Sequence, residues 1–230
     1  GRHVGWGDGV YKSINAGKSW TNMGLKQSEH IGKILIHPND SNVIYVASEG
    51  PLWSAGGDRG LYKSTDGGGS WKRILEIDEN TGITDIEFHP ENPDVIYAAA
   101  YERRRHVWGL MAGGPNGGIY KSGDGGASWK ELEDGLPGGD VGKIGLAVTK
   151  ANPGLVYATI DADEDNKGFY RSRDQGETWS RENSYVSGGT GPHYYMELEA
   201  SPQNAELVFQ MDVFLHVTRD GGAHFNYLGT

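Results

Sequence analysis

The chain has 230 residues, of which 37 are glycine and none is cysteine, and its formal net charge is −10. The lack of cysteine excludes a disulfide framework and a cysteine-ligated zinc site, and the acidic balance argues against a nucleic-acid partner, which needs a basic face. No apolar run reaches the roughly 18 residues of a transmembrane helix, so the composition is typical of a turn-rich β protein without a transmembrane segment.

The first predicted elements are two short strands, at residues 9–13 and 19–23. Nothing before them is long enough for two more strands, so residues 1–24 are predicted to be half of a four-stranded unit. The next unit is complete. Residues 31–37, 43–48, 60–64 and 70–75 alternate apolar with polar side chains between short turns, which predicts four antiparallel strands.

Three further units follow. In each, the turn between the first two strands has a sequence similar to the corresponding turn of the second unit. The turns read HPNDSNVIY at residue 37, HPENPDVIY at 89, TKANPGLVY at 149 and SPQNAELVF at 201. Pro and Asn mark the turn, so His37 and His89, which precede Pro, are interpreted as structural. An aromatic residue recurs in each second strand, as expected of a core position: Tyr45, Tyr97, Tyr157 and Phe209. The complete units are assigned to residues 25–78, 79–135, 136–184 and 185–230.

One eight-residue pattern recurs in all five units, which makes this a repeat protein. The copies are SINAGKSW at residue 13, STDGGGSW at 64, SGDGGASW at 122, SRDQGETW at 172 and TRDGGAHF at 218. Their spacing of about 50 residues fits a four-stranded propeller blade and is too long for most helical repeats. A hydroxyl and a carboxylate two residues apart bond backbone groups within one turn, and glycine supplies a positive φ. The pattern therefore predicts a turn between two antiparallel strands.

This motif resembles the Asp-box, or BNR repeat, of sialidase-type, sortilin-like and xyloglucanase propellers. The resemblance implies an all-β propeller of four-stranded antiparallel blades, with about four and a half blades of a larger propeller in this segment, so that missing strands come from a longer parent or from a neighbouring subunit. In those families the motif is a structural turn away from the catalytic face. The residues interpreted as structural are Asn15, Asp66, Asp124, Asp174 and Asp220. The aromatic residues expected to pack between blades are Trp20, Trp71, Trp129, Trp179 and Phe225.

The opposite face of a propeller collects the loops that enter the first strands and leave the second strands, and here the units differ from one another. A binding surface on a repeated scaffold is expected at such a place. Guanidinium groups and aromatic rings in a loop from residue 101 to 118 suit a carboxylate, phosphate or sugar, and the alternative is a solvated charge cluster. The candidate binding residues are Trp53, Arg103, Arg104, Arg105, His106, Trp108, His193 and Tyr194.

Acidic residues recur at or just after each second strand. Two carboxylates that face each other across a groove serve as general acid and base in glycoside hydrolysis, although no local motif assigns a catalytic residue here. The candidates are Glu49, Glu102, Asp161 and Asp212. The segment DADEDN also places Asp161, Asp163 and Asp165 at alternate positions, as calcium loops often do, with a solvated acidic loop as the alternative. Apart from calcium, no cofactor is expected.

The interpretation chosen from the sequence is a non-catalytic binding or scaffold module, most similar to bacterial sortilin-like proteins that carry glycosyl-hydrolase names. We expect it to be secreted or periplasmic and to contact a protein or carbohydrate partner. Two alternatives stay open. One is a glycoside hydrolase of xyloglucanase or sialidase type, which needs an acid pair. The other is an assembly subunit of a larger complex, as are propellers that assemble photosystems.

Overall fold

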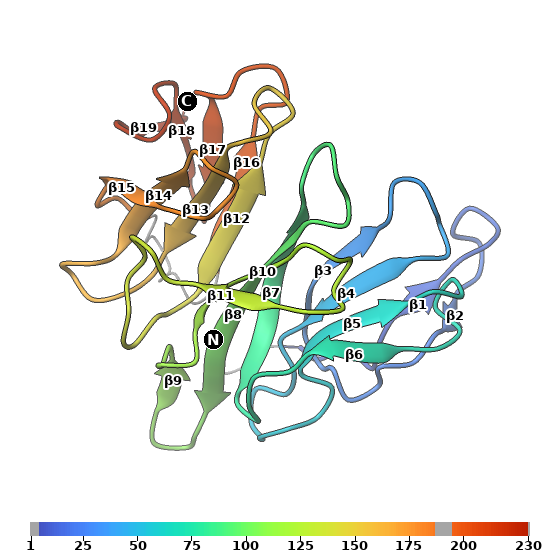
Figure 1. Cartoon of the computed structure of the whole chain (residues 1–230). Coiled ribbons are helices and arrows are strands. Elements are labelled where there is room, and N and C mark those ends of the chain that lie inside the picture. The colour runs from blue at the N-terminus through green and yellow to red at the C-terminus, as the bar shows by residue number, and fades with distance from the viewer. Residues whose placement is uncertain (1–4, 187–194, 230) are drawn as a thin grey trace.

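The computed structural model describes residues 5–186 and 195–229, and Figure 1 shows the course of the chain. In these residues all regular structure is β, and no helix is long and apolar enough to cross a membrane. The strands form one two-stranded sheet and four larger antiparallel sheets. We call the sheets blades 1 to 5 in chain order.

Blades 1 and 2 contain the first six strands. Blade 1 pairs β1 (Tyr11–Lys12) with β2 (Thr21–Asn22). Blade 2 has the order β3 (Ile31–Ile36), β4 (Ile44–Ser48), β5 (Gly60–Ser64) and β6 (Lys72–Leu75). Each strand pairs with the next along the chain, as the alternating sequence pattern predicts.

Blades 3 to 5 repeat this meander. Blade 3 has the order β7 (Thr81–Phe88), β8 (Ile96–Arg105), β10 (Gly118–Ser122) and β11 (Lys130–Leu132), and β9 (Leu110–Ala112) pairs with the end of β8. Blade 4 has the order β12 (Ile144–Val148), β13 (Val156–Ile160), β14 (Gly168–Ser172) and β15 (Ser180–Asn183). Blade 5 has the order β16 (Glu197–Ala200), β17 (Val208–Met211), β18 (Leu215–Thr218) and β19 (Asn226–Tyr227).

The first strands of blades 2 to 5 contact one another in sequence, β3 with β7, β7 with β12 and β12 with β16. The sheets spread outward from this row, as Figure 1 shows for the blue, green, yellow and red blades. Four-stranded sheets that share an inner row of strands are the blades of a propeller. The predicted fold class is therefore confirmed, and the described part is a partial propeller.

The hydrophobic core lies between adjacent blades. Trp179 of blade 4 packs with Tyr97 and Leu132 of blade 3, and Phe225 of blade 5 packs in the same way with Phe169 of blade 4. Trp20 does not follow this pattern, since it is 61% exposed. Each of the other Asp-box aromatic residues covers the preceding blade, and no blade precedes Trp20 in the described residues. The expectation that Trp20 packs between blades is thus wrong for this structure.

The Asp-box turns have one hydrogen-bond pattern, clearest in blade 2. The Ser64 hydroxyl donates to Asp66 Oδ1 at 2.8 Å and accepts the Gly68 N–H at 2.8 Å. The Ser70 N–H donates to the same carboxylate at 2.9 Å. The hydrogen bonds that Asp66 accepts hold its pKa at about 2. Those from Ser70 contribute most, followed by the one from the Ser64 hydroxyl. The Ser-x-Asp spacing is explained by this closed turn, and the structural role of the Asp-box acids stays a prediction that the geometry favours.

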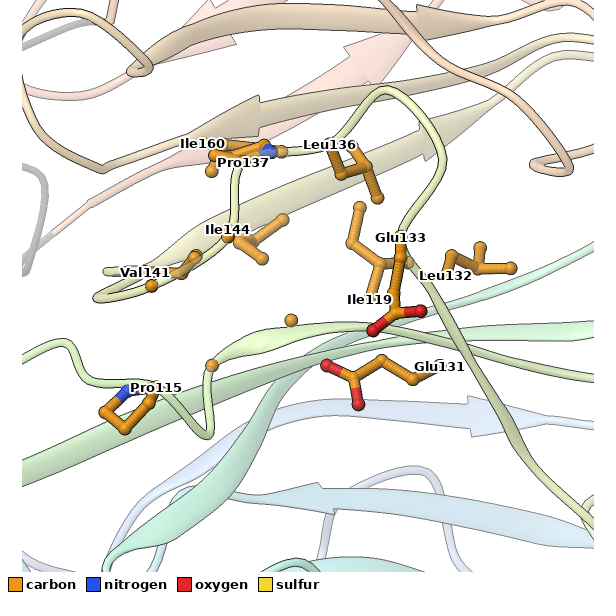
Figure 2. A pocket seen from close by; sticks show the side chains of 14 residues that line it. Pro115, Ile119, Glu131, Leu132, Glu133, Leu136, Pro137, Val141, Ile144 and Ile160 are labelled. Carbon is orange, nitrogen blue, oxygen red and sulfur yellow. The ribbon is translucent and has the colours of Figure 1, made fainter.

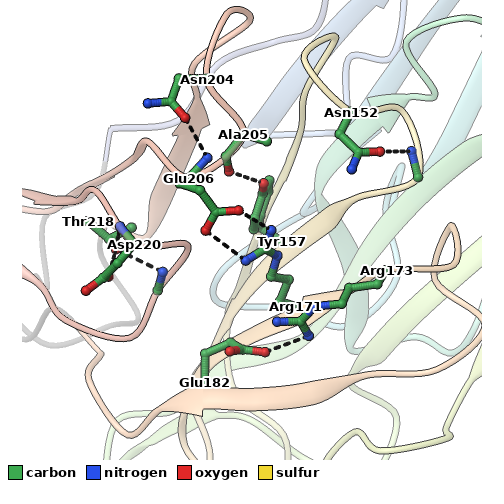
Figure 3. A network of polar contacts seen from close by, with 12 residues as sticks. Asn152, Tyr157, Arg171, Arg173, Glu182, Asn204, Ala205, Glu206, Thr218 and Asp220 are labelled. Atoms are coloured by element: carbon green, nitrogen blue, oxygen red, sulfur yellow. Dashed lines mark hydrogen bonds and ion pairs between the residues drawn. The ribbon is translucent and has the colours of Figure 1, made fainter.

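Polar contacts also join neighbouring blades, and Figure 3 shows those between blade 4 and the β16–β17 turn of blade 5. The Tyr157 hydroxyl donates to the Ala205 carbonyl, and Arg171 forms two hydrogen bonds with the Glu206 carboxylate, at 2.7 and 3.1 Å. One blade earlier, the Tyr97 hydroxyl of blade 3 donates instead to the Gln175 carbonyl in the Asp-box of blade 4, at 2.9 Å. These contacts set the angle between blades and leave the opposite end of each blade to carry the variable loops.

Candidate active site on the loop face

We define the loop face as the end of the blades opposite the Asp-box turns. The segments 49–59, 103–117, 133–143 and 161–167 lie there, because they follow second strands or precede first strands in antiparallel sheets. Of the candidate binding residues, His193 and Tyr194 lie outside the described residues.

The three consecutive arginines lie in a β-hairpin and not in a loop as the sequence analysis expected. β8 continues through Arg105, and Arg103, Arg104 and Arg105 pair with Ala112, Met111 and Leu110 of β9. The turn closes with the His106 N–H bonded to the Gly109 carbonyl at 2.7 Å. We call residues 103–112 the arginine hairpin. A hairpin fixes the direction of its side chains, so the arginines are presented in alternation on its two faces.

The arginine hairpin is attached to the loop that leaves blade 2. Arg103 Nη1 forms an ion pair with Glu49 Oε2 at 2.6 Å, and the Arg105 N–H donates to the Leu52 carbonyl at 2.7 Å. Buried Arg59 holds the same loop, because its guanidinium donates to the carbonyl oxygens of Glu49, Pro51 and Ser54. Burial lowers the pKa of Arg59 to about 10.

Two of the four candidate acids act electrostatically on one buried tyrosine. Tyr101 of β8 is 1% exposed, and its hydroxyl has no hydrogen-bond partner in the described residues. Burial is the main cause that raises the pKa of Tyr101. The positive charge of Arg103 opposes this rise, and the negative charges of Glu49 and Asp161 add to it. Glu49 of blade 2 and Asp161 of blade 4 therefore both lie within electrostatic range of this hydroxyl.

Asp161 follows β13 and is half-buried. Burial raises the pKa of its carboxyl to about 6, although the positive charge of Lys167 opposes the rise. The backbone holds the residue, with the Asp161 N–H bonded to the Lys143 carbonyl at 3.0 Å and the Gly142 N–H bonded to the Asp161 carbonyl at 2.8 Å. A Cβ on Gly142 would lie 2.4 Å from Asp161 Oδ2, so glycine makes room for the carboxyl. Such a carboxyl is suited to carry a proton in weakly acidic solution.

Glu102 and Asp212 do not join this pair. Glu102 is buried and accepts the Asn116 side-chain N–H at 3.2 Å, and a Cβ on Gly114 would lie 2.1 Å from its carboxylate. Its contacts anchor the segment that follows β9. Asp212 lies in the turn between β17 and β18, where its N–H donates to the Phe214 carbonyl at 3.1 Å. The ring of four acids suggested by the sequence is thus reduced to Glu49 and Asp161.

Exposed tryptophans lie on the same face. Trp53 follows Leu52, which bonds the arginine hairpin, and it is 47% exposed. Trp108 is 86% exposed at the hairpin tip, where its ring stacks on His106 with centroids 4.6 Å apart. Trp6 borders the neighbouring hollow beside Pro51. Flat apolar rings on an otherwise polar face suit the faces of sugar rings.

The acidic segment after β13 forms a local turn around Asp163. The Asp163 carboxylate accepts the N–H groups of Asp165 and Asn166 and the Asn166 side chain, which closes a local turn. Among the described residues no three His, Asp or Glu side chains are grouped to hold a metal ion. The Asp161 carboxyl lies beside Gly142, so the geometry does not favour the calcium site of Asp161, Asp163 and Asp165, which stays a prediction.

Sequence reasoning missed a small pocket between blades 3 and 4, shown in Figure 2. Ile119, Ile144 and Ile160 form its apolar wall, and Glu131 and Glu133 carry carboxylates at its edge. Its volume of about 190 Å³ is below the range of roughly 300–1,000 Å³ usual for ligand pockets, so it does not hold an oligosaccharide. The alternation of Glu131, on the edge strand β11, with Glu133, just after it, was the signal that could have revealed it.

The blades, the Asp-box turns and the polar loop face define an Asp-box β-propeller. A family model described as "Sortilin, neurotensin receptor 3" (Sortilin-Vps10) matches residues 8–167, and a BNR/Asp-box repeat model matches residues 170–181. Since the first match spans more than half of the chain, this chain belongs to the Sortilin-Vps10 family.

Curated relatives are xyloglucanases. The chain is 27% identical over 193 residues to a xyloglucanase of Hypocrea jecorina, a match that spans 79% of this chain and 21% of the relative. It is 31% identical over 134 residues to a xyloglucanase of a Paenibacillus species, spanning 54% of this chain and 11% of that relative. The chain therefore spans about a fifth or less of the length of these relatives. Because they come from a fungus and a bacterium, a bacterial origin does not follow.

Solved structures with the same fold include GH74 enzymes. An enzyme from Niastella koreensis matches with a TM-score of 0.71 and 20% identity over 96% of this chain and 35% of its own. A GH74 xyloglucanase from Xanthomonas campestris matches with a TM-score of 0.69 and 17% identity over 94% of this chain and 34% of its own. At these identities the likeness establishes the fold alone. The sequence relatives nevertheless overturn one expectation: the interpretation of the chain as a non-catalytic scaffold is wrong, and the hydrolase alternative is favoured.

Proposed function

We propose that this chain is part of a secreted glycoside hydrolase that acts on xyloglucan or a similar polysaccharide. The observation that carries the proposal is the sequence likeness to xyloglucanases over up to 79% of the chain. The loop face supports it independently, because it combines two carboxylates near a buried hydroxyl with exposed tryptophan rings.

In this proposal Asp161 is the general acid and Glu49 is the general base. Asp161, whose pKa is raised to about 6 by burial, donates its proton to the glycosidic oxygen as the bond from that oxygen to the anomeric carbon breaks. Glu49, which forms an ion pair with Arg103, accepts a proton from the water that attacks the anomeric carbon. The water supplies the hydroxyl of the new reducing end, so every proton is accounted for.

The test is the release of reducing ends from xyloglucan by the full chain. Asp161→Asn and Glu49→Gln should each lower kcat by about 10²- to 10⁴-fold, because each removes one proton transfer. The wild-type rate should fall as the pH rises through about 6, where Asp161 loses its proton. Unfolding curves of the variants should stay close to wild type.

The matched control is Asp163→Asn, two residues from Asp161 in an exposed turn. It should keep wild-type kcat. Full activity in Asp161→Asn, or an equal loss in Asp163→Asn, would remove Asp161 from the mechanism. No release of reducing ends by the wild-type chain would count against the hydrolase proposal itself.

A further inference from the structure

Of the arginines on the loop face, the proposed reaction uses only Arg103, through its ion pair with Glu49. Four of the ten arginines lie at the arginine hairpin and the loop beneath it, in a protein whose net charge is −10. Arg59 is buried under this loop, and the charges of Arg103 and Arg104 lie close enough to lower its pKa further. The negative charges of Glu49 and Asp78 oppose this effect at Arg59, and four arginines gathered in one place are the arrangement expected where a further anion is bound.

The four guanidinium groups differ in what they already bind. Arg103 forms an ion pair with Glu49, and the terminal nitrogens of Arg59 donate to three backbone carbonyls. Arg104 meets only the neutral Asn80 side-chain oxygen, at 3.3 Å. The Arg105 guanidinium has no hydrogen bond or ion pair with any residue that the structure describes, and its Nε is buried without a partner. Arg105 is therefore the cation that is open to a ligand.

Arg105 is held in place before any ligand arrives. Its backbone N–H is bonded to the Leu52 carbonyl at 2.7 Å, and its strand pairs with β9 through Leu110. Two exposed tryptophans lie close to it along the chain, because Trp53 follows Leu52 and Trp108 lies at the tip of the same hairpin. Because the backbone of Arg105 is already fixed, less conformational entropy is lost when a ligand binds there.

We propose that Arg105, with Trp53 and Trp108, forms a subsite for a sugar that bears a carboxylate, that is, a uronic acid residue. The guanidinium fork matches a planar carboxylate through two parallel hydrogen bonds. The tryptophan faces match the sugar ring that carries it. This subsite goes beyond the proposed hydrolase function, because the name xyloglucanase specifies no acidic sugar. Binding at the subsite does not require hydrolysis.

The experiment is calorimetric titration of the full chain with trigalacturonate and with its methyl ester, which has the same shape without the charges. The acid should bind about 10- to 100-fold more tightly than the ester, the range for a hydrogen bond to a charged group. The difference should shrink as salt is added. Arg105→Gln should abolish the preference for the acid, Arg105→Lys should retain part of it, and Trp108→Ala should weaken both ligands.

The matched control is Arg219→Gln, because Arg219 is an exposed arginine in the Asp-box of blade 5, at the opposite end of the blades. It should bind as wild type does. Equal affinity for acid and ester, an unchanged preference in Arg105→Gln, or displacement of the acid by an equal concentration of phosphate would overturn the proposal. Asp161→Asn should bind the acid normally while hydrolysis is lost, so a failure of the hydrolase proposal and a failure of this subsite give different results.

Discussion

The fourth position of each Asp-box adopts a left-handed backbone. Its φ is 56° at Ala16, 72° at Gly67, 68° at Gly125, 60° at Gln175 and 68° at Gly221. Three copies use glycine, which reaches this region without strain, whereas a residue with a Cβ loses about 1–2 kcal/mol there. Gln175 is exposed, and only its carbonyl makes a contact between blades, with the Tyr97 hydroxyl. The glutamine side chain is therefore dispensable for the turn.

Gln175→Gly should raise the free energy of unfolding by about 0.5–1 kcal/mol. The relief of left-handed strain exceeds the entropy that glycine adds to the unfolded chain, which is about 0.4–1 kcal/mol. The matched control is Gly125→Gln, the reverse change at the same position of the preceding blade, which should lower the free energy of unfolding. Urea unfolding measures both. A decrease in both variants would show that backbone strain does not decide this position.

At the scale of the element, the contribution of each Asp-box aromatic residue to stability depends on how much of its side chain the preceding blade buries. Trp179 is 7% exposed, and Trp179→Ala should cost about 3–5 kcal/mol, because it empties a site between blades 3 and 4. Trp20→Ala is the same change in the Asp-box of blade 1, which no preceding blade covers among the described residues. It should cost less than about 0.5 kcal/mol. Thermal unfolding separates the two. Similar losses in both variants would mean that Trp20 has a cover in the folded protein.

The repeated elements could be predicted because each copy of the motif carries the same local chemistry. Turn, strand and core aromatic recur at fixed offsets, so the blades follow from the sequence. The arginine hairpin could not, because the run from Tyr101 to Arg105 lacks the alternation of a half-buried strand and its partner β9 has only three residues. The approach of Glu49 and Asp161 to Tyr101 depends on how three blades are placed side by side. That placement is tertiary, and residues 112 positions apart carry no local sign of it.

At the scale of the molecule, one polar cluster ties three blades together along the row of inner strands. Lys33 of β3 forms ion pairs with Asp85 at 2.9 Å and Glu87 at 2.6 Å, both on β7. Asp85 also accepts the Leu146 N–H of β12 at 2.8 Å. One lysine thus faces two buried carboxyls. Burial raises the pKa of Glu87 to about 7, and the negative charges of Asp85 and of Glu199 on β16 add to the rise, against the opposing charge of Lys33.

The direction of this pKa shift fixes how stability depends on pH. Glu87 binds its proton more tightly in the folded chain than in the unfolded chain, whose pKa is near 4.5. Its contribution to stability is therefore complete below about pH 4.5 and is lost as the pH rises through about 7. Removing the lysine should make this loss larger, because the ionised carboxyls would have no cation between them.

Lys33→Met should therefore lower the free energy of unfolding by about 3–5 kcal/mol at pH 8, the cost of leaving a buried charge unpaired. The loss should be smaller at pH 5, where Glu87 is protonated. Urea unfolding of both proteins at the two pH values measures this difference. Lys143→Met is the matched control on the next inner edge, since Lys143 pairs at 3.5 Å with Glu197, whose side chain is 54% exposed, and it should cost less than about 1 kcal/mol at either pH. If the two lysine variants lose equal stability, or if the loss in Lys33→Met does not grow with pH, the cluster does not join the blades in the way its geometry indicates.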